Sequence, residues 1–417
     1  MFRLAALSLR NRAGTAALTV LAIAVSVMML LGVDKVRTAA RDSFASTIAG
    51  TDLIVGARSG SLNLLLYSVF RIGNATNNVR WASVQDLAQR PEVAWTVPLS
   101  LGDSHFGFRV LGTTPGYFEH YRYRNGRPLV FQRGAPFADL FDAVIGADVA
   151  RTLGYRLGDP IVIAHGLAAA PGAQHADKPF RVAGVLAKTG TPADRTVHVS
   201  LEGITAIHVD WQGGARIPGL TTPADAVRAM DLTPRDVTAV LVGLQSRLAA
   251  FRLQRWVNEY APEPLTAILP GVALQELWGL VGTAETALAA VSVLAVLTAV
   301  LGMVAIVLAT LGERRREMAI LRSVGAHASV VFGLMLTEAA VLTALGALLG
   351  TASLYLALFA LQPLIDARFG LFLPLTPPTP REVALLAGVV IGGTVAGLLP
   401  ALRAYRLSLA DGMTVRT

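Results

Sequence analysis

The 417-residue sequence contains no cysteine and few charged residues of any kind. Without cysteine the chain forms no disulfide framework, no cysteine-ligated zinc site and no thiol nucleophile. Charged residues make up only 15% of the chain, against about 25% in an ordinary soluble domain. Lysine occurs only as Lys35, Lys178 and Lys188, so the net charge of +8 comes almost entirely from arginine. The composition excludes an ordinary soluble protein.

Several short catalytic motifs are missing as well. The phosphate loop G-x-x-x-x-G-K-[ST] does not occur, and no lysine follows a glycine anywhere, so we expect no ATP binding by that route. Neither the G-x-S-x-G nucleophile elbow nor the H-E-x-x-H zinc motif is found. The sequence therefore predicts that this chain is not an enzyme, and a membrane-anchored hydrolase is the least favoured function.

Hydrophobic residues make up 53% of the chain and gather in four long runs. The first run, 13–33, carries no charge and is long enough to span a bilayer. A cleaved signal peptide is the competing interpretation, although its apolar region usually has only about 7–15 residues. The remaining runs are 286–312, 328–365 and 383–402. The sequence predicts one transmembrane helix, a long gap, and three further transmembrane helices.

The arginines predict the orientation of these helices. Segment 1–12 has three arginines and no acid, segment 313–327 has four arginines against two glutamates, and segment 403–417 has three arginines against one aspartate. Charges in segment 366–382 balance. Basic segments remain in the cytoplasm, so residues 34–285 are expected in the periplasm of a bacterium, outside its inner membrane. Because topology explains the basic charge, no nucleic-acid partner is expected.

Residues 34–285 have the pattern of an α+β domain. Short apolar runs predict strands at 52–56, 106–111, 143–145, 161–163, 180–186 and 196–200. Helical patterns cover 83–89, 147–153, 201–208 and 246–259. The flanks, 34–50 and 271–285, look like helical continuations of the first two spans. The predicted fold class is an α-helical membrane protein with four transmembrane helices and a large α+β periplasmic domain on a helical stalk.

Two histidines in this domain are weak candidates for a metal site. His165 and His175 lie in one expected loop with Asp177, and zinc binds imidazole nitrogen and carboxylate oxygen. Two loop histidines ten positions apart are more often solvated side chains. No metal is expected in the chain, with this pair as the weak exception.

The segment between the second and third runs has the pattern of a short amphipathic helix. Met318, Leu321 and Val324 recur every three residues and form one apolar stripe, and Gly325 stands where a helix takes its left-handed end. Anchoring of a basic segment at the membrane surface is one interpretation. The other interpretation is that the helix docks into a groove of a partner protein, because its charged face and its apolar face are both presented to the cytoplasm. The segment includes Glu313, Arg314, Arg315, Arg316, Glu317, Met318, Ile320, Leu321, Arg322, Val324 and Gly325.

This segment, E-R-R-R-E-M-A-I-L-R-S-V-G-A at 313–326, resembles the loop between the second and third spans of a known family. That family comprises the permease subunits of ABC transporters of the MacB, LolC/LolE and FtsX type. The stretches 336–339, 345–350, 399–406 and 409–412 resemble its third span and its ending. Stretches 144–159 and 180–186 are similar to its periplasmic domain. The resemblance covers nearly the whole chain and is most specific at the carboxy-terminal end.

The resemblance implies a mechanism and a set of partners. Residues 313–325 would form the coupling helix that contacts a cytoplasmic ATPase, which would hold the ATP and magnesium, with no cofactor in this chain. A second copy or a paralogue would complete a dimer, and a periplasmic adaptor or lipoprotein carrier would receive the substrate. MacB proper carries its ATPase at its own amino terminus, and nothing resembling one precedes Met1. FtsX proper has a much smaller outer domain.

Two functions follow from the resemblance. The first is a permease that uses cytoplasmic ATP for mechanical work in the periplasm, extracting or exporting a lipoprotein, a lipid or a hydrophobic compound. The alternative is an FtsX-like signalling or scaffold protein that regulates a periplasmic partner without transport. A neighbouring adaptor gene would favour transport, whereas a neighbouring peptidoglycan hydrolase gene would favour signalling.

Small residues and one acid mark the predicted spans. Three G-x-x-x-G patterns predict close helix contacts, including contacts that would support dimerisation. Glu338 interrupts an apolar run, so it is either a functional intramembrane acid or a side chain near the cytoplasmic end that reaches the headgroups. The glycines are Gly346, Gly350, Gly388, Gly392, Gly393 and Gly397.

These interpretations divide the chain into nine segments. They are a cytoplasmic amphipathic segment (1–12), transmembrane helix 1 (13–33), the stalk and periplasmic domain (34–285), transmembrane helix 2 (286–312), the coupling helix (313–327), transmembrane helix 3 (328–365), a short periplasmic turn (366–382), transmembrane helix 4 (383–402) and a cytoplasmic tail (403–417).

Overall fold

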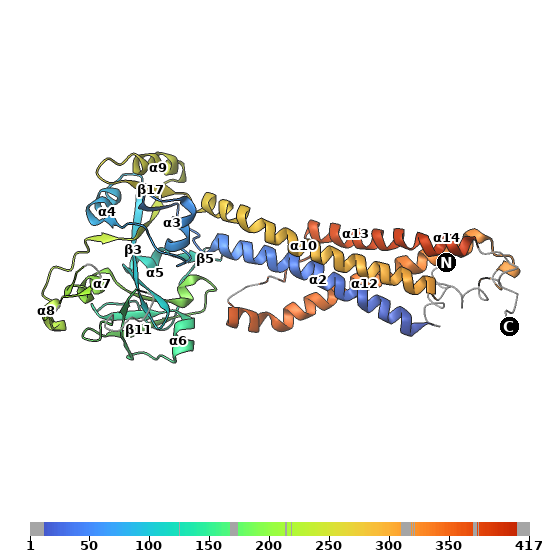
Figure 1. Ribbon diagram of the computed structural model, residues 1–417, viewed down its shortest axis with the longest axis horizontal. Helices are drawn as coiled ribbons and strands as arrows, with labels where there is room; N and C mark the ends of the chain where they lie inside the picture. Colours follow the sequence, from blue (N-terminus) through green and yellow to red (C-terminus); the bar gives the residue numbers. More distant parts are fainter. Residues whose placement is uncertain are drawn as a thin grey trace. The chain divides into compact units, whose positions relative to one another are not determined.

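The computed structural model describes residues 12–124, 126–166, 174–212, 215–217, 219–309, 318, 320, 322–369, 373 and 375–406. The chain divides into two compact units (Figure 1). The membrane unit comprises Met1–Ala39, Gly282–Leu364 and Leu373–Thr417. The outer unit comprises Ala40–Val281 and Ile365–Phe372.

The membrane unit is built from helices that are long and apolar enough to cross a membrane. Within the described residues there are four such spans, Ala13–Ala39, Gly282–Ala309, Ala328–Ile365 and Pro380–Tyr405, in the predicted order of one followed by three. The helices that contain them are α2 (Ala13–Ser46), α10 (Pro270–Ala309), α12 (Ala328–Phe369), α13 (Pro380–Ala396) and α14 (Leu398–Tyr405).

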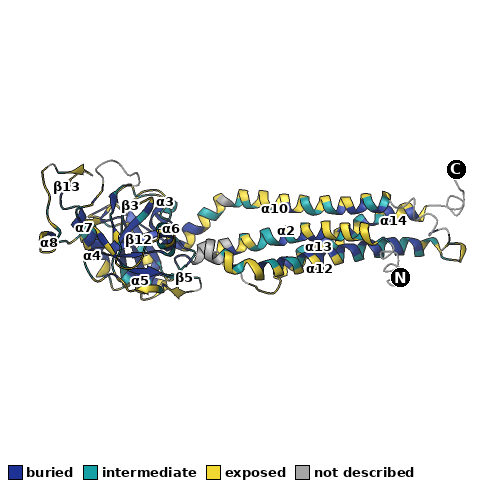
Figure 2. Ribbon diagram, turned by 90° about the horizontal axis from the view of Figure 1, so that it is seen from below, coloured by how far each residue is buried: buried dark blue, intermediate teal, exposed yellow. Residues whose placement is uncertain are grey.

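Most of the surface of these helices faces outward. Only 22–33% of the residues in the apolar core of each span are buried, and Figure 2 shows exposed residues along every helix. An apolar surface of this extent is unfavourable in water but is the surface that a lipid bilayer solvates. The membrane unit therefore has the surface of a membrane protein.

The outer unit is an α+β domain whose described residues form one mixed sheet of eleven strands. Its main path runs β17-β1-β16-β3-β4-β12-β8-β11-β7, with β10 paired to β3 and β9 paired to β11. The strands are β1 (Leu53–Ala57), β3 (Val93–His105), β4 (Phe108–Thr113), β7 (Phe131–Gly134), β8 (Asp142–Ile145), β9 (Pro160–Ile161), β10 (Ala164–His165), β11 (Phe180–Leu186), β12 (Thr196–Ser200), β16 (Ala239–Leu244) and β17 (Leu265–Ile268).

Short helices and three small strand pairs complete the outer unit. The pairs are β2 (Val79–Arg80) with β15 (Asp236–Val237), β5 (Arg122–Tyr123) with β6 (Arg127–Pro128), and β13 (Trp211–Gln212) with β14 (Ala215–Arg216). The helices are α3 (Ser61–Ser68), α4 (Trp81–Ala88), α5 (Gly116–His120), α6 (Ala147–Leu153), α7 (Leu201–Ile207), α8 (Ala224–Val227), α9 (Ala250–Asn258) and the 3₁₀ turns Pro192–Arg195 and Arg247–Ala249.

The long strand β3 joins two parts of the outer unit. Its first half pairs with β16, with Val97 opposite Leu241, and its second half pairs with β4, with Ser100 opposite Gly112. The register shifts between Leu101 and Ser104, where a bulge bends the strand. One apolar cluster joins residues of β1, β3, β4, β8, β11 and β16, while smaller clusters lie around β1, β16 and α9 and around β8, β11 and β12. The long strand β3 therefore belongs to a core that extends along the sheet.

Sequence patterns located many of these elements and missed others. Strands β11 and β12 and helix α6 have the predicted bounds. The strand predicted at 106–111 is wrong at its start, because Phe106 and Gly107 have φ angles of 45° and 81° and form a turn. The strand predicted at 161–163 already ends at Ile161. Strands β3, β16 and β17 were not predicted at all.

Candidate functional site

The predicted coupling segment is described only in part. Glu313, Arg314, Arg315, Arg316, Glu317 and Leu321 lie outside the described residues. Among the others, Met318 is only 6% exposed and packs with Val331, Leu334, Met335, Ala401 and Ala404. Ile320 and Val324, by contrast, are 56% and 84% exposed. Met318 is therefore buried within its own chain while Val324 is open, and because Leu321 lies outside the described residues, the apolar stripe stays a prediction.

The end of this segment has the predicted conformation. Gly325 has a φ of +100°, the left-handed region that ends a helix and that glycine adopts without strain. Arg322 is half-buried, and Ser323 is exposed. The described part of the segment thus has two exposed apolar side chains, Ile320 and Val324.

Four of the six predicted glycines pack helices of one chain together. A Cβ added to Gly350 would lie 2.4 Å from the carbonyl oxygen of Ala24 on α2, and one added to Gly346 would lie 2.6 Å from Ile23. Gly393 and Gly397 approach Thr343 and Ala339 of α12 in the same way, at 2.0 and 2.4 Å. These four glycines therefore confirm the prediction of close helix contacts, and the contacts lie within one chain.

The two remaining glycines face outward. A Cβ added to Gly388 or Gly392 meets nothing within 4 Å in the described part of the chain. This face of α13 remains the part of the glycine prediction that is compatible with an intermolecular contact.

Glu338 is buried in the membrane unit. Its exposed fraction is 2%, and it precedes Ala339, which contacts Gly397. Glu338 therefore packs among the helices of the membrane unit, and both of its predicted roles stay predictions.

A network of charges ties α2 to the start of α13. Lys35 Nζ lies 3.0 Å from Glu382 Oε1, and both side chains are less than 10% exposed. The Lys35 ammonium also lies over the ring of Tyr355, 5.0 Å from its centroid. Glu382 and Thr379 form a capping box at the first turn of α13. Sequence reasoning treated 366–382 as a simple turn and missed this network, although T-P-R-E at 379–382 is a recognisable capping signal.

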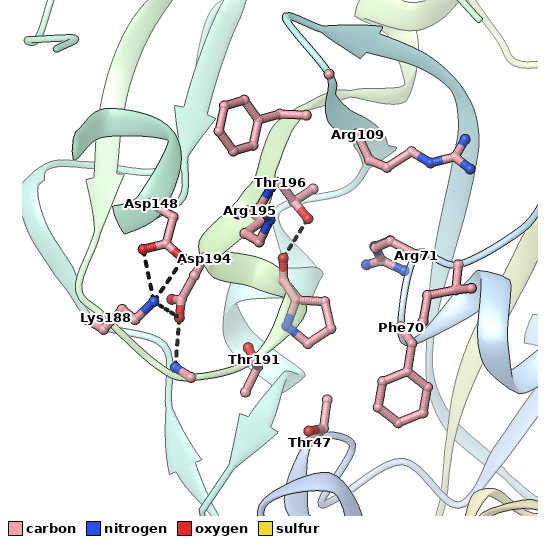
Figure 3. Close-up of a pocket in the computed structure, with 15 residues that line it drawn as sticks. Thr47, Phe70, Arg71, Arg109, Asp148, Lys188, Thr191, Asp194, Arg195 and Thr196 are labelled. Atoms are coloured by element: carbon pink, nitrogen blue, oxygen red, sulfur yellow. Dashed lines mark hydrogen bonds and ion pairs between the residues drawn. The ribbon is translucent and has the colours of Figure 1, made fainter. Parts of the chain in front are cut away.

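A cavity of about 560 Å³ opens in the outer unit. Figure 3 shows Arg71 and Arg109 on one side and Lys188, Asp148 and Asp194 on the other. Burial and the charge of Arg71 lower the pKa of Arg109. The apolar residues that line the cavity include Phe70, Ile72 and Phe108. This combination can hold a ligand with an apolar body and an anionic group.

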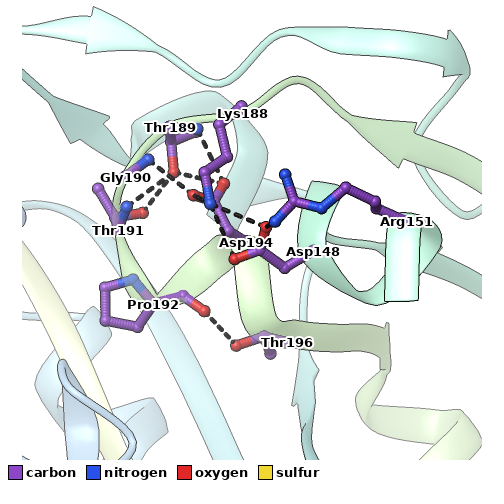
Figure 4. A network of polar contacts seen from close by, with 9 residues as sticks. All are labelled: Asp148, Arg151, Lys188, Thr189, Gly190, Thr191, Pro192, Asp194 and Thr196. Atoms are coloured by element: carbon purple, nitrogen blue, oxygen red, sulfur yellow. Dashed lines mark hydrogen bonds and ion pairs between the residues drawn. The ribbon is translucent and has the colours of Figure 1, made fainter. Parts of the chain in front are cut away.

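The floor of the cavity is a rigid loop between β11 and β12. The Asp194 carboxylate accepts hydrogen bonds from the backbone N–H of Thr189 at 2.8 Å and of Gly190 at 2.7 Å (Figure 4). Lys188 Nζ lies 2.8 Å from Asp148 and 3.2 Å from Asp194. Because the two acids share Lys188, the positive charge left to face a ligand in this cavity belongs to arginine.

The two histidines predicted as weak metal candidates are brought together. His165 at the end of β10 and His175 join Asp103 of β3 and His208, which follows α7, so that one ligand atom from each lies within 4.8 Å of the others. Asp177, predicted as their neighbour, instead pairs with Lys178 and Arg216. Sequence reasoning missed Asp103 and His208, because neither stands near the loop in sequence.

Burial and mutual contacts shift the pKa values of this cluster. Burial lowers the pKa of His175 to about 4, with His208 contributing. Burial alone would raise the pKa of Asp103, but hydrogen bonds from His165 and His208 lower it to about 2. Burial also opposes charge on His208, yet Asp103 outweighs it and raises the pKa of His208.

Two family models match this chain. The MacB-like periplasmic core domain matches residues 16–242, which is more than half of the chain. The FtsX-like permease C-terminal model matches residues 289–409. The two matches together cover α2, most of the outer unit and the later membrane helices.

Curated relatives match over parts of their length. The macrolide export ATP-binding/permease protein MacB of Nitrobacter winogradskyi is 34% identical over 30% of this chain and 19% of its own length. The ABC transporter permease YvrN of Bacillus subtilis is 34% identical over 27% of this chain and 26% of its own. The pyoverdine export ATP-binding/permease protein PvdT of Pseudomonas syringae is 25% identical over 79% of this chain and 47% of its own. The chain thus spans less than half the length of these relatives.

Two solved structures align with about half of this chain. The periplasmic region of MacB from Actinobacillus actinomycetemcomitans aligns with 55% of this chain and 94% of its own, at 12% identity and a TM-score of 0.34. The extracellular domain of the ABC-type transporter YknZ from Gram-positive bacteria aligns with 52% and 99%, at 14% identity and a TM-score of 0.29.

Proposed function

Because the chain belongs to the MacB/FtsX-type family of ABC transporter permeases, we propose that it couples ATP hydrolysis by a cytoplasmic ATPase to mechanical work outside the membrane. The ATPase resides on a separate subunit, which holds the ATP and magnesium. The permease sits in the bacterial inner membrane and works as a dimer with a second copy or a paralogue. Its outer unit acts in the periplasm on a lipoprotein, a lipid or a hydrophobic compound.

The observation that carries this proposal is the continuity of two helices. Helix α2 contains the span Ala13–Ala39 and continues to Ser46, and α10 begins at Pro270, ahead of the span Gly282–Ala309. A helix is stiff along its hydrogen-bonded axis, so a displacement of the span is carried into the segment beyond it. This continuity supports transmission of motion from the membrane helices to the outer unit.

Two further observations support export of a substrate with an apolar part. Two relatives are named as export proteins, one for macrolides and one for pyoverdine. The outer cavity combines the apolar side chains Phe70 and Phe108 with Arg71, Arg109 and Arg195. Guanidinium groups bind anionic groups through directed hydrogen bonds, so a substrate with an apolar body and an acidic group suits this cavity.

The ATPase contact is tested at the two exposed apolar residues of the coupling segment. If Ile320 and Val324 bury against the ATPase, Ile320→Asp and Val324→Asp place a charge in a desolvated contact and cost roughly 2–4 kcal/mol of binding. Both variants then reach the membrane at normal level but lose the co-purifying ATPase. Since the side chains are exposed in this chain, the fold is unaffected.

Leu248→Asp is the matched control, because Leu248 is an apolar residue that is 92% exposed in the outer unit. It receives the same charge and retains the ATPase. Retention of the ATPase at wild-type stoichiometry by both coupling-segment variants would leave the segment as a membrane anchor only.

A further inference from the structure

We propose that Asp103, His165, His175 and His208 form a binding site for a divalent transition-metal ion, with Zn²⁺ as the ion that suits the donor set best. The site belongs to the outer unit and goes beyond the proposed transport function. Three imidazoles and one carboxylate are a ligand set typical of Zn²⁺, and cysteine is not needed for it.

The distances among three of the ligand atoms match a tetrahedral site. Asp103 Oδ1 lies 3.1 Å from His165 Nδ1, and His165 Nδ1 lies 3.2 Å from His208 Nε2. The third side of this triangle, from His208 Nε2 to Asp103 Oδ1, is 3.6 Å. Zinc–ligand bonds of about 2.0–2.1 Å in tetrahedral geometry place neighbouring ligand atoms about 3.3 Å apart. The three atoms thus already form one face of a coordination tetrahedron.

The fourth residue provides an independent indication of a ligand. His175 is fully buried, with 0% exposure, and neither ring nitrogen has a hydrogen-bond partner among the described residues. Buried polar atoms without a partner are rare, because they lose their hydrogen bonds to water and gain none in return. The ring lies 4.8 Å from that of His208, centroid to centroid. A metal ion at the cluster would supply the missing partner.

Neighbouring groups orient the ligands. His208 Nδ1 donates a hydrogen bond to the carbonyl oxygen of Ile204 at 2.8 Å, so that loss of the proton from Nε2, the nitrogen that faces Asp103, would leave a lone pair there for a metal ion. Trp211 covers the cluster, with its ring 4.5 Å from that of His175. Backbone pairing of Asp103 with His165 between β3 and β10 fixes these two side chains on adjacent strands.

The site also has an entry path. The side chain of His165 is 37% exposed and contributes to a cavity of about 280 Å³ that Leu101 and Gly166 also line. An ion can therefore reach the cluster from solvent without opening the sheet. Once bound, it would tie strands β3 and β10, the segment at His175 and the end of α7 into one unit.

The experiment uses the full-length chain in detergent, purified on a tag without histidine and stripped of metal with a chelator. Zn²⁺ is titrated by calorimetry, and Co²⁺ is added separately, since its visible absorption is intense in tetrahedral sites. We expect one Zn²⁺ per chain, an intense Co²⁺ spectrum, and a rise in melting temperature on adding Zn²⁺. His165→Ala, His208→Ala and Asp103→Asn should each weaken Zn²⁺ binding at least about 100-fold.

His120→Ala is the matched control, because His120 lies in the same unit, stacks on Trp95 and is not part of the cluster. It should bind Zn²⁺ like the wild type. His165→Ala decides the outcome if a buried variant fails to fold, since His165 is partly exposed. Binding that is equally tight in the wild type and in His165→Ala, or no binding by a folded wild type, would overturn the proposal and leave a hydrogen-bonded cluster only.

Discussion

At the scale of single residues, the surroundings decide what each histidine of the outer unit does. His198 is fully buried between the rings of Tyr117 and Phe118, and its Nδ1 donates to the carbonyl oxygen of Val144 at 3.2 Å. Burial, together with the charge of Arg71, lowers the pKa of His198 to about 3. His208, by contrast, faces the carboxylate of Asp103, which raises its pKa despite burial.

The low pKa of His198 predicts that the outer unit becomes less stable toward unfolding as the pH falls. Its pKa is about 3 in the folded chain and about 6.5 when unfolded, so between these values only the unfolded chain takes up the proton. The free energy of unfolding is unaffected above pH 6.5 and falls below it, by about 2 kcal/mol at pH 5. His198→Asn, which keeps a donor for Val144, should remove this part of the pH dependence of the melting temperature. If the melting temperatures of the wild type and of His198→Asn fall by the same amount from pH 7 to pH 5, His198 is not a source of the acid sensitivity.

Sequence reasoning reached half of the histidine cluster. His165 and His175 stood out because they share one loop, but Asp103 and His208 lie on other elements that only the sheet brings near. Strand β3 was missed because Pro98, Gly102 and Asp103 interrupt its apolar pattern, yet the bulge near Gly102 is what delivers Asp103 to the site. Residues that are brought together only by strand pairing show no pattern in the local sequence that would predict their contact.

At the scale of elements, close helix contacts hold the membrane unit together. Gly346 and Gly350 let α12 approach α2, while Gly393 of α13 and Gly397 at the junction of α13 and α14 approach α12. The G-x-x-x-G pattern predicted close packing correctly, but it does not tell whether the partner helix belongs to the same chain. The paired charges of Lys35 and Glu382 add a polar contact between α2 and α13.

Valine substitutions at two glycines separate packing within the chain from open surface. Gly350→Val places side-chain atoms against the Ala24 backbone and should destabilise the membrane unit by about 1–3 kcal/mol, because α2 and α12 must move apart. Gly392→Val introduces the same residue where nothing lies within 4 Å, so it should leave the chain's own stability nearly unchanged. Melting temperature in detergent measures both. Equal melting temperatures for the two variants would show that α2 and α12 do not meet at Gly350.

At the scale of the whole molecule, the chain is an ABC transporter permease of the MacB/FtsX type, with four spans and one large outer domain among the described residues. The four apolar runs predicted the number and order of these spans, because a helix needs a minimum apolar length to cross a bilayer. The arginines predicted only the orientation of the spans, which stays a prediction. The internal arrangement of the outer domain was less predictable, since its sheet pairs strands far apart in the chain. The central claim is that the outer unit and the coupling segment lie on opposite sides of the membrane.

The absence of cysteine allows this claim to be tested directly with single thiols. Leu248→Cys in the outer unit and Val324→Cys in the coupling segment sit at side chains that are 92% and 84% exposed, so either thiol reacts readily wherever reagent reaches it. A membrane-impermeant maleimide is applied to spheroplasts before and after permeabilisation. The account predicts labelling of Leu248→Cys in intact spheroplasts and labelling of Val324→Cys only after permeabilisation. Labelling of Val324→Cys in intact spheroplasts, or protection of Leu248→Cys, would contradict it.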